Sequence, residues 1–200
     1  MRSWGLCGVI LLMSLVTACS GDEGSDSTAT STTEVPRADW ITPDGKEPAA
    51  ANRPSELTVD DVRPCDLLTD DQRGELRLTG EQTSEYSSTW GADTCKILGA
   101  DALSASLTAV SSDGIDALYL GRFANLQYRP TEVRGFPAIF YRFDNADHAC
   151  YLAVDVADGQ LVDLAFGAGD PDSTTASQDE LCDTAHQVVE AAVNTLLADR

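Results

Sequence analysis

The chain has 200 residues, of which 42% are hydrophobic, so it is long enough to bury the core of one domain. It carries 33 acidic residues against 13 Lys and Arg residues, and its formal net charge is -20. A surface this acidic repels phosphate backbones, which excludes electrostatic binding of nucleic acid.

The first eighteen residues have the pattern of a secretory signal. Arg2 precedes an apolar run, residues 4–16, that is too short to span a bilayer as a mature helix. The sequence Val-Thr-Ala-Cys that ends at Cys19 resembles the bacterial lipobox, in which a diacylglyceryl group is attached to the cysteine sulfur before cleavage. We therefore expect a signal peptide over residues 1–18 and a membrane anchor at Cys19, because two acyl chains hold a protein on a bilayer. The alternative is an ordinary secreted protein with a chance cysteine.

Residues 19–56 are rich in Ser, Thr, Asp and Pro and have no periodic apolar pattern. This composition predicts a disordered tether. As a flexible coil, a tether of roughly 37 residues would have a root-mean-square span of about 35 Å. Trp40 and Ile41 are isolated apolar residues within it, and they indicate either a locally sticky linker or a docking patch.

A globular domain is predicted over residues 57–200. Thr69 and Gln72 have the spacing of a capping box, so the first helix is expected over residues 70–77. Strands are expected over residues 94–98 and 103–111, and the second of these alternates between apolar and polar residues. Apolar residues on one helical face predict a second helix within residues 113–126.

The C-terminal half contains three strand candidates, residues 138–143, 150–156 and 161–167. Asp158 and Gly159 lie between the last two and indicate a tight hairpin. In the last segment, residues 177–199, apolar residues recur at steps of three and four, which predicts an amphipathic helix. Strands in hairpins with helices at either end predict an α+β fold, an antiparallel β-sheet with helices packed on one face.

The six cysteines do not form a single set. Cys7 would leave with the signal peptide, and Cys19 would carry the lipid. The remaining four are Cys65, Cys95, Cys150 and Cys182. Outside the cytoplasm, four cysteines indicate two disulfides, and the alternative of a zinc site lacks any Cys-x-x-Cys pair. Three connectivities are open to four cysteines; we expect Cys65–Cys95 with Cys150–Cys182, and a Cys65–Cys182 pair is the alternative.

No catalytic, cofactor or metal site is predicted. His186 lies four residues after Cys182 in the last predicted helix, where a structural or surface role is expected. His148 ends the sequence DNADH (residues 144–148), which lacks calcium-loop spacing and is typical of a polar hairpin loop. Residues 169–173 are expected to be a loop that leads into the last helix. Hydrolase, zinc-protease, P-loop and dinucleotide-binding motifs are missing from the sequence.

Four aromatic residues in the C-terminal half have two possible places. They are Tyr128, Phe136, Phe140 and Tyr141. Packing in the core is the expected place, and the alternative is an exposed groove lined by their rings.

Several motifs in order resemble one known family. They are RPCDLLTDDQ, a later Cys95, VRGFPA, CYLAVDVADGQLVDLAF and ELCDTAHQVVEAAVNTL. Together they resemble the actinobacterial lipoproteins of the domain-of-unknown-function 3558 (DUF3558) family over about residues 62–197. One departure is that the tryptophan expected close to Cys95 is Trp90, five residues before it. The resemblance implies a location in the cell envelope and carries over no catalytic residue.

We therefore expect a lipoprotein anchored at Cys19 on the extracytoplasmic face of the cell membrane. Its expected role is that of a non-catalytic binding or accessory module for an envelope protein, a lipid or a cell-wall component. The alternative is an envelope hydrolase with an unrecognised active site. All three classes of partner are compatible with the sequence.

Overall fold

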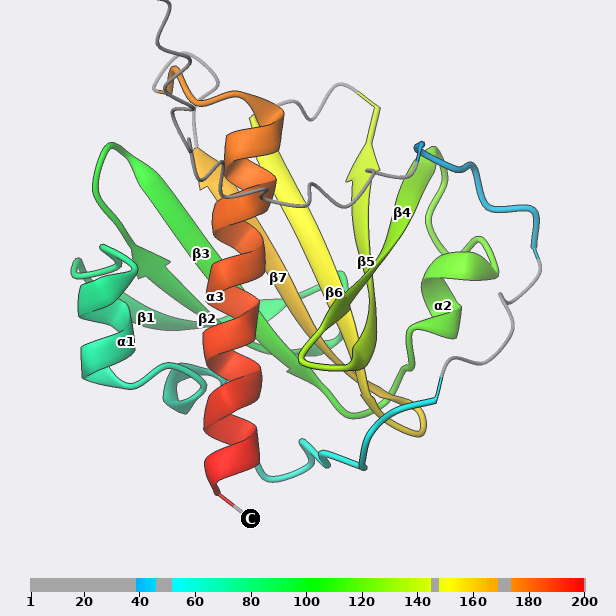
Figure 1. The fold of residues 1–200 in the computed structure, drawn as a ribbon, viewed down its shortest axis with the longest axis horizontal. Helices are drawn as coiled ribbons and strands as arrows, with labels where there is room; N and C mark the ends of the chain where they lie inside the picture. Colours follow the sequence, from blue (N-terminus) through cyan, green and yellow to red (C-terminus); the bar gives the residue numbers. More distant parts are fainter. Residues whose placement is uncertain (1–38, 46–51, 145–147, 169–173, 200) are drawn as a thin grey trace, which may run out of the picture. The chain divides into compact units, whose positions relative to one another are not determined.

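The computed structural model describes residues 39–45, 52–144, 148–168 and 174–199. In this part of the chain one antiparallel sheet has the strand order β1-β2-β3-β7-β6-β5-β4 (Figure 1). The strands are β1 (Gln82–Ser87), β2 (Ala92–Leu98), β3 (Leu103–Val110), β4 (Leu126–Val133), β5 (Phe136–Phe143), β6 (Ala149–Ala157) and β7 (Gln160–Ala168). The helices are the 3-10 turn η1 (Pro64–Asp66), α1 (Asp70–Glu75), α2 (Asp116–Tyr119) and α3 (Gln178–Ala198).

The sheet consists of two meanders joined at its centre. Strands β1 to β3 follow one another, and the chain then crosses through α2 to the far edge, where β4 begins. Strands β4 to β7 return toward the centre, and β7 pairs with β3, for example at Leu164 opposite Leu107. The expected hairpin at Gly159 is confirmed, because Gly159 has a φ of +68° and connects β6 to β7. The predicted α+β class with an antiparallel sheet is therefore confirmed.

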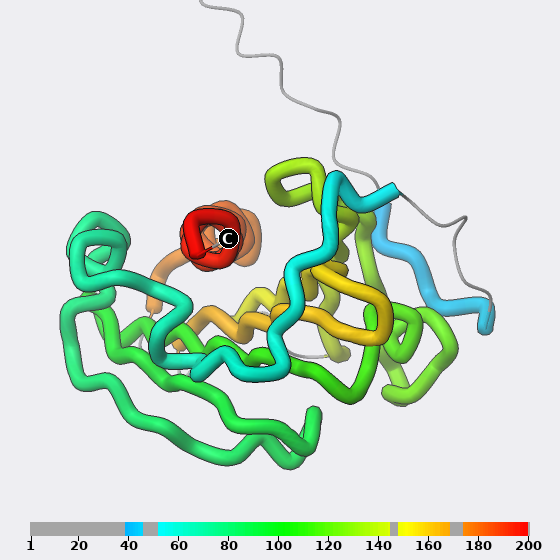
Figure 2. The backbone as a smooth tube through the Cα atoms, turned by 90° about the horizontal axis from the view of Figure 1, so that it is seen from below, coloured from blue at the N-terminus to red at the C-terminus, as the bar shows by residue number. Residues whose placement is uncertain are grey.

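Helix α3 covers one face of the sheet and packs into the main core, to which it contributes eight buried residues (Figure 2). It begins at a capping box in which Ser177 and Glu180 exchange hydrogen bonds. Its buried residues are Leu181, Cys182, Ala185, Val188, Val189, Ala192, Val193 and Leu196. Helix α1 lies beside α3, and the Gln72 side-chain amide donates to the carbonyl of Ala191 at 3.0 Å. The predicted apolar stripe of the last helix is thus the stripe that faces the sheet.

The short helix α2 packs against the opposite face. Leu118 and Tyr119 are buried there in a second core with Trp90 and Tyr128. The predicted helix within residues 113–126 is four residues long in the structure. It ends early because Gly121 has a φ of +80°, which an α-helix does not contain.

Candidate functional site

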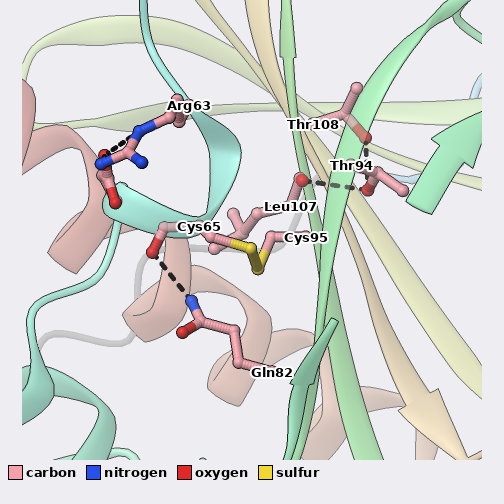
Figure 3. Close-up of a disulfide and its surroundings, with 8 residues drawn as sticks. Arg63, Cys65, Gln82, Thr94, Cys95, Leu107 and Thr108 are labelled. Atoms are coloured by element: carbon pink, nitrogen blue, oxygen red, sulfur yellow. Dashed lines mark hydrogen bonds and ion pairs between the residues drawn. A yellow bond between two sulfur atoms is a disulfide. The ribbon is translucent and has the colours of Figure 1, made fainter. Parts of the chain in front are cut away.

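The first disulfide connects Cys65 of η1 to Cys95 of β2, as expected (Figure 3). The carbonyl of Cys65 accepts a hydrogen bond from the side-chain amide of Gln82 in β1 at 2.8 Å. Cys95 is fully buried, and it lies directly opposite Ser84 of β1 in the strand register. The bridge therefore fixes the β1–β2 hairpin to the segment that leads into α1.

The second disulfide connects Cys150 of β6 to Cys182 of α3, again as expected. Both cysteines are buried in the main core. The side-chain amide of Gln178 also donates to the carbonyl of Ala149, beside Cys150, at 2.6 Å. The first turns of α3 are therefore attached to a central strand both covalently and by a hydrogen bond.

A buried carboxylate, Asp163 of β7, connects three parts of the second core. Its Oδ2 accepts from the indole Nε1–H of Trp90 at 2.8 Å, and its Oδ1 accepts from the hydroxyl of Tyr141 at 2.7 Å. Trp90 lies in the turn between β1 and β2, and Tyr141 lies in β5. Tyr151 stacks against Tyr141 with ring centroids 5.1 Å apart.

The charge of Asp163 depends on this burial. Loss of water around the carboxyl group raises the pKa of Asp163 to about 6, and the two donors partly oppose the rise. Burial also raises the pKa of Tyr141 well above its ordinary value, so its hydroxyl remains a proton donor to the carboxylate. Asp163 is only 5% exposed, and both of its carboxylate oxygens accept hydrogen bonds. We therefore interpret the cluster as a structural contact that holds the β1–β2 turn against the sheet, and not as an acid–base site.

The segment from residue 39 to 45, which we call the strap, lies on the edge strand β4. Ile41 and Tyr128 exchange two backbone hydrogen bonds of 2.8 Å. The guanidinium carbon of Arg129 lies 5.0 Å from the ring centroid of Trp40, and that of Arg142 lies 4.3 Å from it. The apolar pair singled out in the expected tether thus contacts the domain.

A second stretch of the expected tether also contacts the domain. Arg53 donates to both carboxylate oxygens of Asp155 at 2.8 Å. Burial raises the pKa of Asp155, an effect that the hydrogen bonds and charge of Arg53 oppose. A little farther along, the amide of Leu57 donates to the carbonyl of Val156 at 2.8 Å. The described residues between 52 and 57 therefore follow the β6–β7 end of the sheet.

The two histidines lie in different surroundings. The ring Nε2 of His186 lies 3.0 Å from the carbonyl oxygen of Glu132 in β4, so it bridges α3 to the sheet edge. His148 is half-buried, and its carbonyl accepts from the amide of Ala168. Neither ring is hydrogen-bonded to a serine or carboxylate among the contacts of the described residues. The expected structural role of His186 fits this geometry.

The four aromatic residues considered for a groove are all buried, as expected for core packing. Phe136 and Phe140 belong to the main core, and Tyr128 and Tyr141 belong to the second core. A small surface groove instead lies between α1, α3 and the β2–β3 turn. It encloses about 230 Å³, its floor includes Leu78 and Phe166, and Arg77 and Asp101 form an ion pair of 3.2 Å at its rim. It is smaller than typical ligand pockets, which enclose roughly 300–1,000 Å³.

Some predicted positions lie outside the described residues, namely Cys19, residues 145–147 and residues 169–173. Within the described ranges, no three His, Cys, Asp or Glu side chains are grouped so that they could hold a metal ion. The same part of the chain contains no helix that is long and apolar enough to cross a membrane.

Sequence reasoning missed the Asp163 cluster and the cation–π stack at Trp40. Asp163 and Trp90 are 73 residues apart, so no local spacing connects them. The sequence contains a partial indication of the stack, since Trp40 is the one aromatic residue of residues 19–56. Its arginine partners lie in β4 and β5, which the sequence does not place beside it.

Comparison with known proteins gives a family but no activity. The family model described as "Protein of unknown function (DUF3558)" matches residues 14–195. Neither the curated proteins nor the solved structures contain a match to this chain. The matched residues include both disulfides, the Asp163 cluster, the strap and nearly all of α3. The chain therefore belongs to the DUF3558 family.

Proposed function

We propose that this protein is a lipid-anchored cell-envelope lipoprotein whose domain acts as a non-catalytic binding module for a partner in the envelope. The observation that carries the proposal is the combination of the lipobox-like sequence at Cys19 with a domain that has two disulfides. Disulfides form and persist in oxidising compartments outside the cytoplasm, which supports export of the chain.

The contacts of the polar core residues support binding over catalysis. Asp163 bonds to Trp90 and Tyr141, and Asp155 is paired with Arg53. These groups stabilise the fold and lie where a substrate would have to displace structural contacts to reach them. A general acid or base instead needs a proton path to a bound substrate.

Among the proposed partners, the geometry favours a protein. A lipid carrier needs an apolar cavity that buries most of its ligand, and the groove at Leu78, with about 230 Å³, is too small to do so. An antiparallel sheet whose edge strand β1 is covered by no described segment offers a protein partner both backbone and side-chain contacts. We therefore propose an envelope protein as the partner.

The anchor can be tested by metabolic labelling with a fatty-acid analogue and by membrane fractionation. We expect the wild-type chain to be labelled and to sediment with membranes, and we expect Cys19→Ala to lose both properties. Cys7→Ala is the matched control, because Cys7 lies inside the expected signal peptide and should leave labelling unchanged. Equal labelling of wild type and Cys19→Ala would overturn the proposed anchor.

A further inference from the structure

The two edges of the sheet differ in how they are protected. On β4, the strap occupies the backbone of Tyr128, Pro130 has no N–H to offer, and the carbonyl of Glu132 lies 3.0 Å from the His186 ring. Proline, bulges and covering segments are the usual means by which proteins block an edge strand. Strand β1, by contrast, ends the strand order with no such device among the described residues.

The hydrogen-bond pattern identifies which backbone groups of β1 point outward. The amide of Leu98 donates to the carbonyl of Glu81 at 2.9 Å, so the backbone of Leu98 points toward β1. The direction of the backbone N–H and C=O groups alternates from one residue to the next along a strand. The backbone groups of Lys96 therefore also point toward β1, where Thr83 lies opposite. The N–H and C=O groups of Gln82, Ser84 and Tyr86 must then point away from the sheet.

This edge is rigid as well as open. Ser84 lies opposite Cys95, which is bound covalently to Cys65, and the Gln82 side chain donates to the Cys65 carbonyl. The other end of the β1–β2 hairpin is held by the bond from Trp90 to Asp163. A strand held at both ends loses little conformational entropy when a further strand pairs with it.

Charge and exposure indicate which kind of strand would pair with β1. The edge carries the exposed residues Glu81 and Glu85, and the neighbouring strand β2 adds an exposed Asp93 and one half-buried lysine, Lys96. Tyr86 is 69% exposed and offers an aromatic surface at the end of the strand. A partner strand with basic residues and alternating β-branched residues would complement both features.

A second copy of this chain fits the edge poorly. Pairing β1 with the β1 of another copy would place the acidic edge with Glu81 and Glu85 against the same acidic edge. The net charge of -20 on each chain adds long-range repulsion. Charge complementarity therefore favours a basic partner over self-association.

We propose that the outer edge of β1, Gln82–Ser87, is a docking site that binds an extended, basic segment of a partner protein as an added β-strand. This inference deepens the binding role proposed above and rests on it. It assigns the backbone contacts to Gln82, Ser84 and Tyr86, and it assigns the charge preference chiefly to Glu85.

The test is hydrogen exchange of the full chain with a synthetic peptide of alternating lysine and valine. We expect the peptide to slow exchange of the Gln82, Ser84 and Tyr86 amides at least tenfold. The amides of Thr83 and Glu85, which point toward β2, should change much less. The same peptide N-methylated at alternate residues keeps its charge but cannot pair as a strand, and it should give no protection.

Two variants keep the test specific. Ser84→Pro removes an outward N–H while leaving the bonds to β2, so it should weaken peptide binding at least tenfold, whereas Ser84→Ala should bind like wild type. Glu85→Lys should weaken binding of the lysine peptide and strengthen binding of the matched glutamate–valine peptide. If Ser84→Pro fails to fold, the Glu85→Lys result decides the question.

Several outcomes would overturn the docking site. The first two are equal protection of the β1 amides by the N-methylated peptide, and protection of β4 amides instead of β1 amides. The other two are peptide binding that neither variant changes, and a dimer, seen by sedimentation, in which the β1 amides are protected without peptide. Failure of the anchor would appear separately, because Cys19→Ala labelling does not depend on β1. The two proposals can therefore fail independently.

Discussion

Asp163 shows how one buried carboxylate makes the stability of the domain depend on pH. Its pKa in the folded chain is about 6, against an ordinary value of 3.8, because burial disfavours its charge. The folded protein therefore binds this proton more tightly than the unfolded chain. The contribution of Asp163 to stability increases as the pH falls from about 6 toward 4, and it is lost as the pH rises through the same window.

We predict that Asp163→Asn removes this dependence. Between pH 7 and pH 4, the difference in unfolding free energy between wild type and the variant should shift by about 2 kcal/mol in favour of wild type. Urea unfolding at several pH values measures the difference. Asp93→Asn, which removes an exposed carboxylate of β2, controls for the loss of one charge. A constant difference across this range would show that Asp163 does not titrate as expected.

The elements of the fold differ in how well the sequence predicts them. Helix α3 and the β6–β7 hairpin were predicted, because an apolar stripe and an Asp-Gly turn are local signals. Strand β1 has the sequence QTSEYS, with no buried residue to give an alternating pattern. Strand β4 contains Pro130 and Arg129, which argue locally against a strand. Both strands form because longer-range pairing with β2 and β5 outweighs local preference.

The candidate site was less predictable than the fold. The disulfide pairs matched the expectation, but the sequence left three connectivities open. The outward direction of the β1 backbone depends on register, which follows from pairing with β2 and not from residue type. The Asp163 contacts combine residues from β5, β7 and the β1–β2 turn, so only the folded sheet brings them together.

At the level of elements, we predict that the Cys150–Cys182 bridge contributes strongly to the attachment of α3. The bridge closes a loop with a sequence separation of 32, for which the chain-entropy model gives about 3–4 kcal/mol. The double variant Cys150→Ala and Cys182→Ala should lose about this much unfolding free energy in urea. Replacing the buried cysteines by alanine would also leave small cavities. The double variant Cys150→Ser and Cys182→Ser, whose side chains are closer in size to cysteine, therefore serves as a comparison. Unchanged stability in both double variants would contradict the prediction.

For the whole molecule, we predict that Trp40 holds the strap on β4. Trp40→Ala removes the cation–π contacts with Arg129 and Arg142, each of which contributes on the order of 0.5–2 kcal/mol. The amide of Ile41, bonded to Tyr128, should then exchange its hydrogen about tenfold faster. Thr42→Ala, a change at an exposed residue of the same segment, should leave that rate unchanged. An unaltered Ile41 rate in Trp40→Ala would show that the backbone bonds alone hold the strap.

The strap gives the sheet an orientation once the proposed anchor is considered. With the chain attached to β4 from residue 39 onward, about 20 residues separate Cys19 from the domain, and if the expected flexible tether forms, a stretch of that length would span about 25 Å. Such a short tether would keep the β4 edge close to the bilayer. The β1 edge lies at the other end of the strand order, roughly 29 Å away at ordinary strand spacing. The edge available for a new strand would thus face outward, into the space where soluble partners arrive.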